Sequence, residues 1–228
     1  MRRHPVVLLA LVLLTAGASA EDAPGAAPIC TDRPTKSTGT CTADAGHLQV
    51  EADLANYTAS TTDGVRTRTW IALNPTVKYG LGPALDVELN VPAWLDTRVS
   101  VPGGQAADSR GSGDLWVKLK WKFYADSSVE VALLPALKAP TGARAVGNGA
   151  WEGGVLLPVV AKLSEDWSLN FSPEFDTVAN AVGPGHHFAT AQLINLGRSL
   201  PHDVTLSVEL WADWERVASV LRTDFFFG

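Results

Sequence analysis

The stretch GDLWVKLKWKFY, residues 113–124, decides the fold. Its centre has a lysine at every second position, at Lys118, Lys120 and Lys122. The alternating positions are apolar: Leu115, Val117, Leu119, Trp121 and Phe123. Because side chains alternate between the two faces of a β-strand, this stretch predicts a strand with one apolar face and one face crowded with like charges. The surroundings of the charged face must offset the repulsion among the three lysines.

Similar alternation recurs along most of the chain and predicts ten strands. They cover residues 47–54, 69–79, 85–91, 113–124, 129–138, 154–163, 167–176, 186–197, 203–211 and 220–227. The stretch 154–163 is nearly all apolar, so only its length and its β-branched residues favour a strand there. Helical periodicity is almost absent, and the sequence therefore predicts an all-β protein.

The connections between these strands alternate in length. Short ones cover 80–83, 125–128, 164–166 and 199–202, and long ones cover 58–65, 96–113, 139–150 and 177–185. A transmembrane β-barrel has short periplasmic turns and longer external loops, whereas nothing in a soluble sandwich sorts connections in this way. The order predicts that both chain ends face the periplasm and that the 96–113 loop faces outward.

The alternating faces fit two kinds of barrel. In a soluble barrel the apolar positions point inward, and in a membrane barrel they face lipid while the charges line the lumen. Dense charge on single faces, strands long enough to span when tilted, and aromatic residues near strand ends favour the membrane. The aromatic residues are Tyr57, Tyr79, Trp94, Trp121, Phe123, Trp151, Trp167 and Trp211. We therefore expect an antiparallel up-and-down transmembrane β-barrel of about ten strands, closed by pairing of residues 220–228 with 47–57.

The charged positions of the strands are the candidate lumen-lining residues. They are Lys118, Lys120, Lys122, Glu51, Asp53, Asp86, Glu88, Glu130, Glu174 and Glu209. A lysine on the lipid side at mid-bilayer costs about 2–4 kcal/mol, so three together there would oppose insertion. In a lumen, water and the carboxylates of neighbouring strands can offset their repulsion. In a soluble barrel the same lysines would form a solvated face.

The N-terminal region is expected to lie outside the barrel wall. Residues 1–20 have the basic start, apolar run and A-x-A exit of a cleaved signal peptide. Residues 21–45 lack strand alternation and predict a periplasmic segment or a plug, and residues 46–228 form the barrel. Cys30 and Cys41 are the two cysteines, and the oxidising compartment favours a disulfide between them, with two free thiols as the alternative.

Composition and motifs give no indication of an enzyme. The formal charge is −6, without a basic patch or arm, which argues against nucleic acid as a partner. Nucleophile-elbow, zinc-protease and phosphate-loop motifs do not occur. His186 and His187 are adjacent and point to opposite faces of a strand, which disfavours a shared metal. We expect no catalytic residue, no cofactor and no metal site.

Several quoted segments resemble a known family. DRPTKSTGTCTADAGHLQVEADL (32–54), GSGDLWVKLKW (111–121), LPALKAPTG (134–142) and GVLLPVVAKL (154–163) resemble a bacterial outer-membrane family described as transporters. This family is related to the proteins of the meta-pathway of phenol degradation. The resemblance implies a β-barrel in the outer membrane of a Gram-negative bacterium that passes small molecules, and it supplies no catalytic residues. Relatives continue through a further hairpin, so either the barrel closes with ten strands or the chain is a shortened form of a twelve-stranded barrel.

The sequence therefore predicts an outer-membrane channel that passes small molecules by passive diffusion through a charged lumen. Its partners are outer-membrane lipid and a small solute. Two other classes stay open: an outer-membrane enzyme acting on lipid, which would need a Ser/His/acid cluster, and a secreted soluble β-barrel that binds a ligand.

Overall fold

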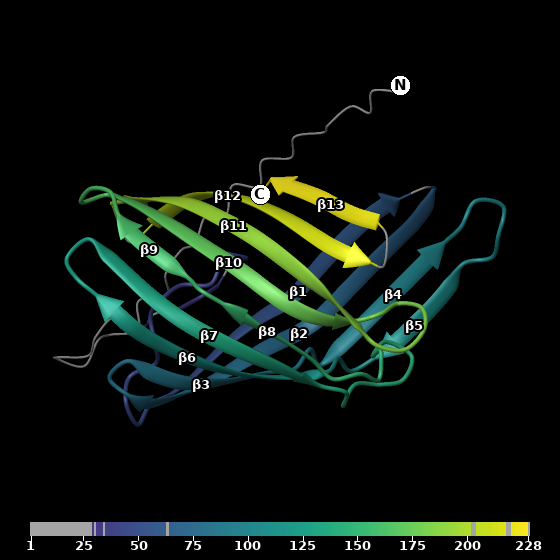
Figure 1. Cartoon of the computed structure of the whole chain (residues 1–228), viewed down its shortest axis with the longest axis horizontal. Coiled ribbons are helices and arrows are strands. Elements are labelled where there is room, and N and C mark those ends of the chain that lie inside the picture. Colours follow the sequence, from purple (N-terminus) through teal and green to yellow (C-terminus); the bar gives the residue numbers. More distant parts are fainter. Residues whose placement is uncertain are drawn as a thin grey trace, which may run out of the picture.

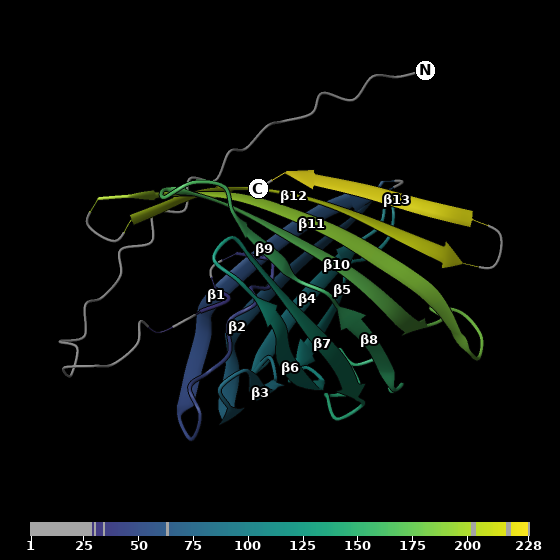
Figure 2. The same cartoon turned by 60° about the vertical axis from the view of Figure 1, so that its left-hand side comes forward.

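The structure is a computed structural model and describes residues 29, 31–33, 35–62, 64–201, 204–217 and 220–227. Its strands form one antiparallel sheet that curves strongly (Figures 1 and 2). The strands are β1 (Leu48–Thr62), β2 (Val65–Gly82), β3 (Leu85–Asn90), β4 (Trp94–Ser100), β5 (Ala107–Gly111), β6 (Leu115–Ala125), β7 (Val129–Ala139), β8 (Glu152–Leu156), β9 (Val159–Lys162), β10 (Trp167–Ala179), β11 (His186–Leu200), β12 (Val204–Val217) and β13 (Val220–Phe227). The all-β prediction is confirmed. No helix long and apolar enough to cross a membrane occurs in the part of the chain that the structure describes.

Each of the ten predicted strands is present, the 154–163 span is divided into β8 and β9, and two further strands, β4 and β5, lie in the stretch predicted as a long connection. Strand β2 pairs with both β3 and β4, and β8 and β9 both pair with β7 and β10. Pro92 separates β3 from β4, and Pro158 separates β8 from β9, because proline cannot donate a ladder hydrogen bond. Consecutive spans are neighbours throughout, so the topology is a meander.

The predicted alternation of connection lengths is wrong for the first two long connections. β1 and β2 extend through most of 58–65, and β4 and β5 occupy much of 96–113. Residues 58–62 read TASTT, which is polar on both faces and rich in threonine. Threonine favours extended backbone, and a solvated hairpin needs no apolar face, so hydrophobic alternation does not detect such a segment.

The predicted pairing of residues 220–228 with 47–57 is not present within the described residues. There β1 pairs with β2 alone, and β13 pairs with β12 alone. An N-terminal segment inside the curve connects the two sides instead, because its backbone bonds both to Glu51 of β1 and to Glu209 of β12. Signal-peptide residues 1–20 lie outside the described residues.

The two faces of the sheet have reversed polarity compared with a soluble protein. Large apolar side chains cover the convex face, and Leu54 and Leu48 are 81% and 67% exposed. The inner face contains buried charges: Lys120 and Asp86 are 0% exposed, and Lys78 is 2% exposed. Strand β6 has both patterns, with its lysines directed inward and Val117, Leu119, Trp121 and Phe123 exposed on the outside.

Candidate functional site

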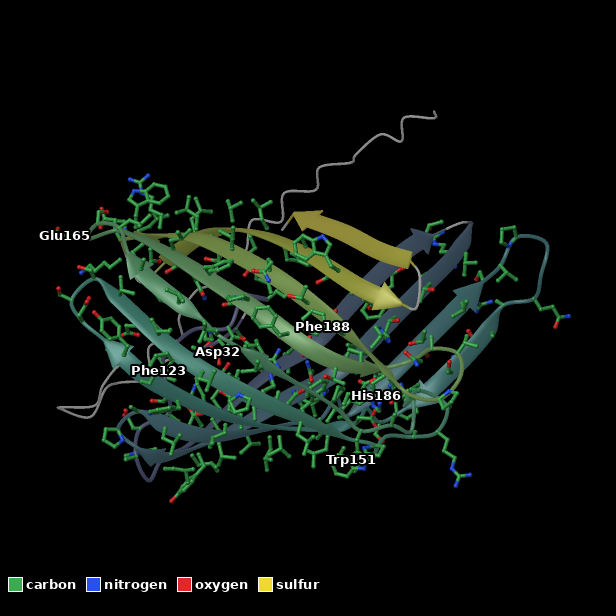
Figure 3. The ribbon with its side chains drawn as sticks, viewed as in Figure 1. Asp32, Phe123, Trp151, Glu165, His186 and Phe188 are labelled. Carbon is green, nitrogen blue, oxygen red and sulfur yellow. The ribbon has the colours of Figure 1, made fainter. Side chains whose placement is uncertain are left out.

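The inner face of the sheet binds a segment of the same chain. We call residues 31–43, of which Pro34 is not described, the inner segment. It contacts β1, β2, β3, β6, β7, β10 and β12. Asp32 lies within the curve of the sheet (Figure 3). The candidate site is this segment with the charged wall around it.

Asp32 is the centre of the contact. Its Oδ2 accepts hydrogen bonds from Lys78 Nζ at 2.5 Å and Lys120 Nζ at 2.6 Å. Glu51 and Glu88 complete the cluster, at 2.6 Å from Lys78 and 3.1 Å from Lys120 respectively. Burial acts to raise the pKa of Asp32, but the charges and hydrogen bonds of Lys120 and Lys78 outweigh it, so this pKa lies below its ordinary value.

Arg33 binds the wall beside this cluster. Its guanidinium forms an ion pair with Asp53 of β1. The same group donates to the Asn74 carbonyl at 2.9 Å and to Thr76 Oγ1 at 3.3 Å. Arg33 therefore joins β1 and β2 on the inner face.

Three carboxylates bind the remainder of the inner segment. Glu209 accepts from the backbone N–H groups of Lys36 and Ser37, each at 2.9 Å, and from Ser37 Oγ at 2.7 Å. Thr40 donates to Glu130 at 2.5 Å, and the N–H of Ala43 donates to Asp86 at 2.8 Å. A carboxylate that accepts hydrogen bonds from two backbone N–H groups and a hydroxyl holds the local backbone in place, and the same hydrogen bonds stabilise the charge of the carboxylate.

Strand β10 adds neutral contacts. Ser172 Oγ and Asn170 Nδ2 donate to the Thr38 carbonyl at 2.8 Å and 3.0 Å, and the Ser172 side chain is fully buried. Where the segment leads into β1, a Cβ on Gly80 would collide with the backbone of Ala43 and Asp44. Glycine permits this close approach of two backbones.

A second charged cluster lies at the other end of the interior. Lys138 Nζ is 2.8 Å from Glu152, 3.3 Å from Asp114 and 2.7 Å from Asn148 Oδ1. Asp114 also accepts from the N–H of Gly142 at 2.7 Å. These contacts join the 140–151 loop to β7, β8 and Asp114, the residue before β6. Trp151 and His186 lie near this end, and Glu165 marks the opposite end (Figure 3).

At least three cavities lie beside the inner segment, and two of them have Lys36 and Glu174 in common. One, of about 210 Å³, is lined by Lys36, Trp116, Lys118 and Glu174 among others. The other, of about 300 Å³, shares Lys36 and Glu174 but is otherwise acidic, with Asp176, Asp213 and Glu215. Lys36 and Glu174 form the boundary between a basic and an acidic compartment.

The structure gives different environments to the predicted lumen-lining residues. Six of them contact the inner segment directly: Glu51, Asp53, Asp86, Lys120, Glu130 and Glu209. A seventh, Glu88, is connected to it through Lys120. Lys122 lies 3.6 Å from Glu130. Lys118 and Glu174 line open cavities. The expectation that all these charges face water is wrong for Asp86, Glu88 and Lys120, because the inner segment covers them.

Sequence reasoning missed several residues of the site. Asp32 and Arg33 lie in a segment without strand periodicity, and no local signal predicts their partners. Lys78, in contrast, shares the polar side of its strand with Asn74 and Thr76, and that alternation could have identified it. Trp116 occupies the lysine face of β6 and could have been found from its parity.

Other predicted features have mixed outcomes. Seven of the eight aromatic residues near strand ends are exposed, but Trp211 lies under Lys36 Nζ, 4.9 Å from the ring centroid. Cys41 is disulfide-bonded, while Cys30 lies outside the described residues, so their pairing stays a prediction. No group of three or more His, Cys, Asp or Glu side chains suited to a metal ion occurs among the described residues.

Fold and site together define a class: an all-β antiparallel protein whose charged inner face binds its own N-terminal segment. The chain belongs to the family described as "Putative MetA-pathway of phenol degradation", which matches residues 31–215. The match includes the inner segment and extends into β12, and it confirms the predicted relation to the phenol meta-pathway family. Comparison with the curated proteins gives no match.

Proposed function

We propose that this chain is an outer-membrane channel that passes small molecules by passive diffusion, and that the inner segment closes most of its pore. The observation that supports this most directly is the reversed polarity of the sheet. Leu119 on the outside is 40% exposed while the adjacent Lys120 is fully buried. Exposed apolar area of this extent requires a cover, and lipid supplies one without contacting the charged face.

The strand lengths agree with this function. β1, β2, β10, β11 and β12 have 13 to 18 residues each. A tilted transmembrane β-strand needs about 9–11 residues, so these strands exceed the hydrocarbon layer. The family match supports a role connected with phenol degradation, and passage of small solutes across the outer membrane is our proposal for that role.

Insertion in lipid requires that the two free edges be paired. Unpaired backbone groups in hydrocarbon cost several kcal/mol each, and β1 and β13 both present such groups. We expect these two strands to pair in a bilayer. Cysteine pairs placed along β1 and β13 should then cross-link in lipid vesicles, and absence of any cross-link would contradict a closed pore.

The test of the function is conductance combined with a labelling pair. Refolded protein in a planar bilayer should give discrete conductance steps. In vesicles, a cysteine at position 118 should react with a water-borne thiol reagent much faster than one at position 119. Position 118 is preferable to 120, because the inner segment covers Lys120. Faster reaction at 119 would indicate a soluble protein with its apolar face turned to a partner.

A further inference from the structure

The cavity lined by Trp116 and Lys118 has a volume suited to one small organic molecule. Its volume of about 210 Å³ is below the roughly 300–1,000 Å³ of pockets for drug-sized ligands. Its wall is hollow because Lys118 is paired with Ala136, which is in turn paired with Gly154, so two small residues follow each other across β7 and β8. Beyond them, Asp176 packs over Gly154 and Glu174 is paired with Leu156.

The cavity has one apolar and one cationic side. Trp116 and Leu156 supply apolar surface. Lys118 and Lys36 line the cationic side, and Lys36 Nζ also lies 4.9 Å from the ring centroid of Trp211. Glu174, which is opposite in charge to them, also lines the cavity. Other lysines of the inner face, Lys78, Lys120, Lys122 and Lys138, are all ion-paired.

The neighbouring acidic cavity determines at which side of the site an anionic group binds. Lys36 and Glu174 line both cavities, and the acidic one continues with Asp176, Asp213 and Glu215. An anion is repelled from that side and attracted to Lys36 and Lys118. A flat ring can then contact the indole of Trp116, since aromatic pairs gain energy beyond their buried area.

We infer that this cavity is a binding site for a small aromatic carboxylate, with the ring against Trp116 and Leu156 and the carboxylate at Lys118 and Lys36. The inference rests on the proposed function, because it names the solute class of the same pore. Lys36 belongs to the inner segment, so the site is complete only while that segment occupies the interior. Binding and closure are therefore coupled, and the anion favours the closed state.

Calorimetric titration of the refolded protein in detergent micelles tests this with three probes. Benzoate has the ring and the charge, cyclohexanecarboxylate has only the charge, and benzyl alcohol has only the ring. We expect benzoate to bind most tightly, with benzyl alcohol about tenfold weaker because it lacks the charge-assisted hydrogen bonds. Cyclohexanecarboxylate should be several-fold weaker because it lacks the aromatic contact.

Two variants assign the contacts. Lys118→Gln should weaken benzoate about tenfold and leave benzyl alcohol unchanged. Trp116→Leu should remove the difference between benzoate and cyclohexanecarboxylate. The matched controls are Lys162→Gln, at an exposed end of β9, and Trp94→Leu, on the outer face. Far-UV circular dichroism of each variant verifies the β-sheet before titration.

Equal affinity for the three probes or an unchanged benzoate affinity in Lys118→Gln would each overturn the inference. Benzylamine, titrated as a fourth and cationic probe, would overturn it by binding more tightly than benzoate. Bilayer conductance of the same preparation separates it from the proposed function. If the protein conducts and does not bind benzoate, the proposed channel function stands and the proposed binding site is wrong. If the protein binds benzoate with the expected variant effects and does not conduct, the proposed binding site stands and the proposed channel function is wrong.

Discussion

Asp32→Asn should release the inner segment from the wall. The carboxylate of Asp32 accepts hydrogen bonds from two buried lysines, at 2.5 Å from Lys78 and 2.6 Å from Lys120. Its other oxygen accepts from the N–H of Gly39 at 2.8 Å. The amide has nearly the same shape and can retain the bond to Gly39, so the substitution mainly removes the charge.

The magnitude follows from the partners that remain. Each charge-assisted hydrogen bond contributes about 1.5–3 kcal/mol. Lys78 retains Glu51 at 2.6 Å and Lys120 retains Glu88 at 3.1 Å, so neither lysine is left without a counter-charge. We therefore take the lower end of this range for each of the two hydrogen bonds and expect the bound state of the inner segment to be destabilised by about 3 kcal/mol. This destabilisation raises the population of the released state about a hundredfold.

The reporter is Ser172→Cys, a position that is fully buried beneath the carbonyl of Thr38. Its reaction with a water-borne thiol reagent, in unreduced protein, should follow the population of the released state when rebinding is fast. Asp32→Asn should raise this rate by up to about a hundredfold. The control is Asp108→Asn, which removes an exposed ion pair with Arg98 worth about 0–1 kcal/mol. An unchanged rate in Asp32→Asn would refute the reasoning.

Three further predictions concern the same segment. Because the pKa of Asp32 is lowered, its carboxylate stabilises the bound inner segment fully above the ordinary pKa of 3.8, and this stabilisation is lost as the pH falls through the lowered pKa. The open-channel probability should therefore rise only at pH below 3.8, and Asp32→Asn should abolish this rise. Gly80→Ala should raise labelling of Ser172→Cys, because a Cβ there collides with backbone, whereas Gly82→Ala, with open space around it, should not. Glu209→Gln should weaken binding of the inner segment less than Asp32→Asn does, because the amide oxygen can still accept a hydrogen bond from the Lys36 N–H, the Ser37 N–H or the Ser37 hydroxyl. An equal or larger effect in conductance recordings would contradict the central role of Asp32.

The strands were predictable because their signal is local. Each of the ten alternating stretches became a strand, and the parity of β6 placed its lysines inward. The extension of β1 through residues 58–61 was not predictable in this way, because these residues are exposed on both faces of the strand and most of them are polar. For the inner segment, the lack of alternation predicted only a place outside the barrel wall, as a periplasmic segment or a plug. Its position depends on pairs such as Asp32–Lys120, which are 88 residues apart, and no local pattern encodes which carboxylate meets which lysine.

The three lysines of β6 explain how one row of like charges is tolerated. Lys120 is fully buried and is neutralised by Asp32 and Glu88. Lys122 lies beside Glu130, near the turn to β7. Lys118 forms no ion pair of this kind with a described residue and lines a cavity that Glu174 also lines. Exchanging all three lysines for glutamate should therefore prevent binding of the inner segment, since Lys120→Glu would oppose Asp32 and Glu88. Exchanging Lys118 alone should leave the segment bound and shift the permeability toward cations, because Lys118 takes no part in the ion pairs that Lys120 and Lys122 form.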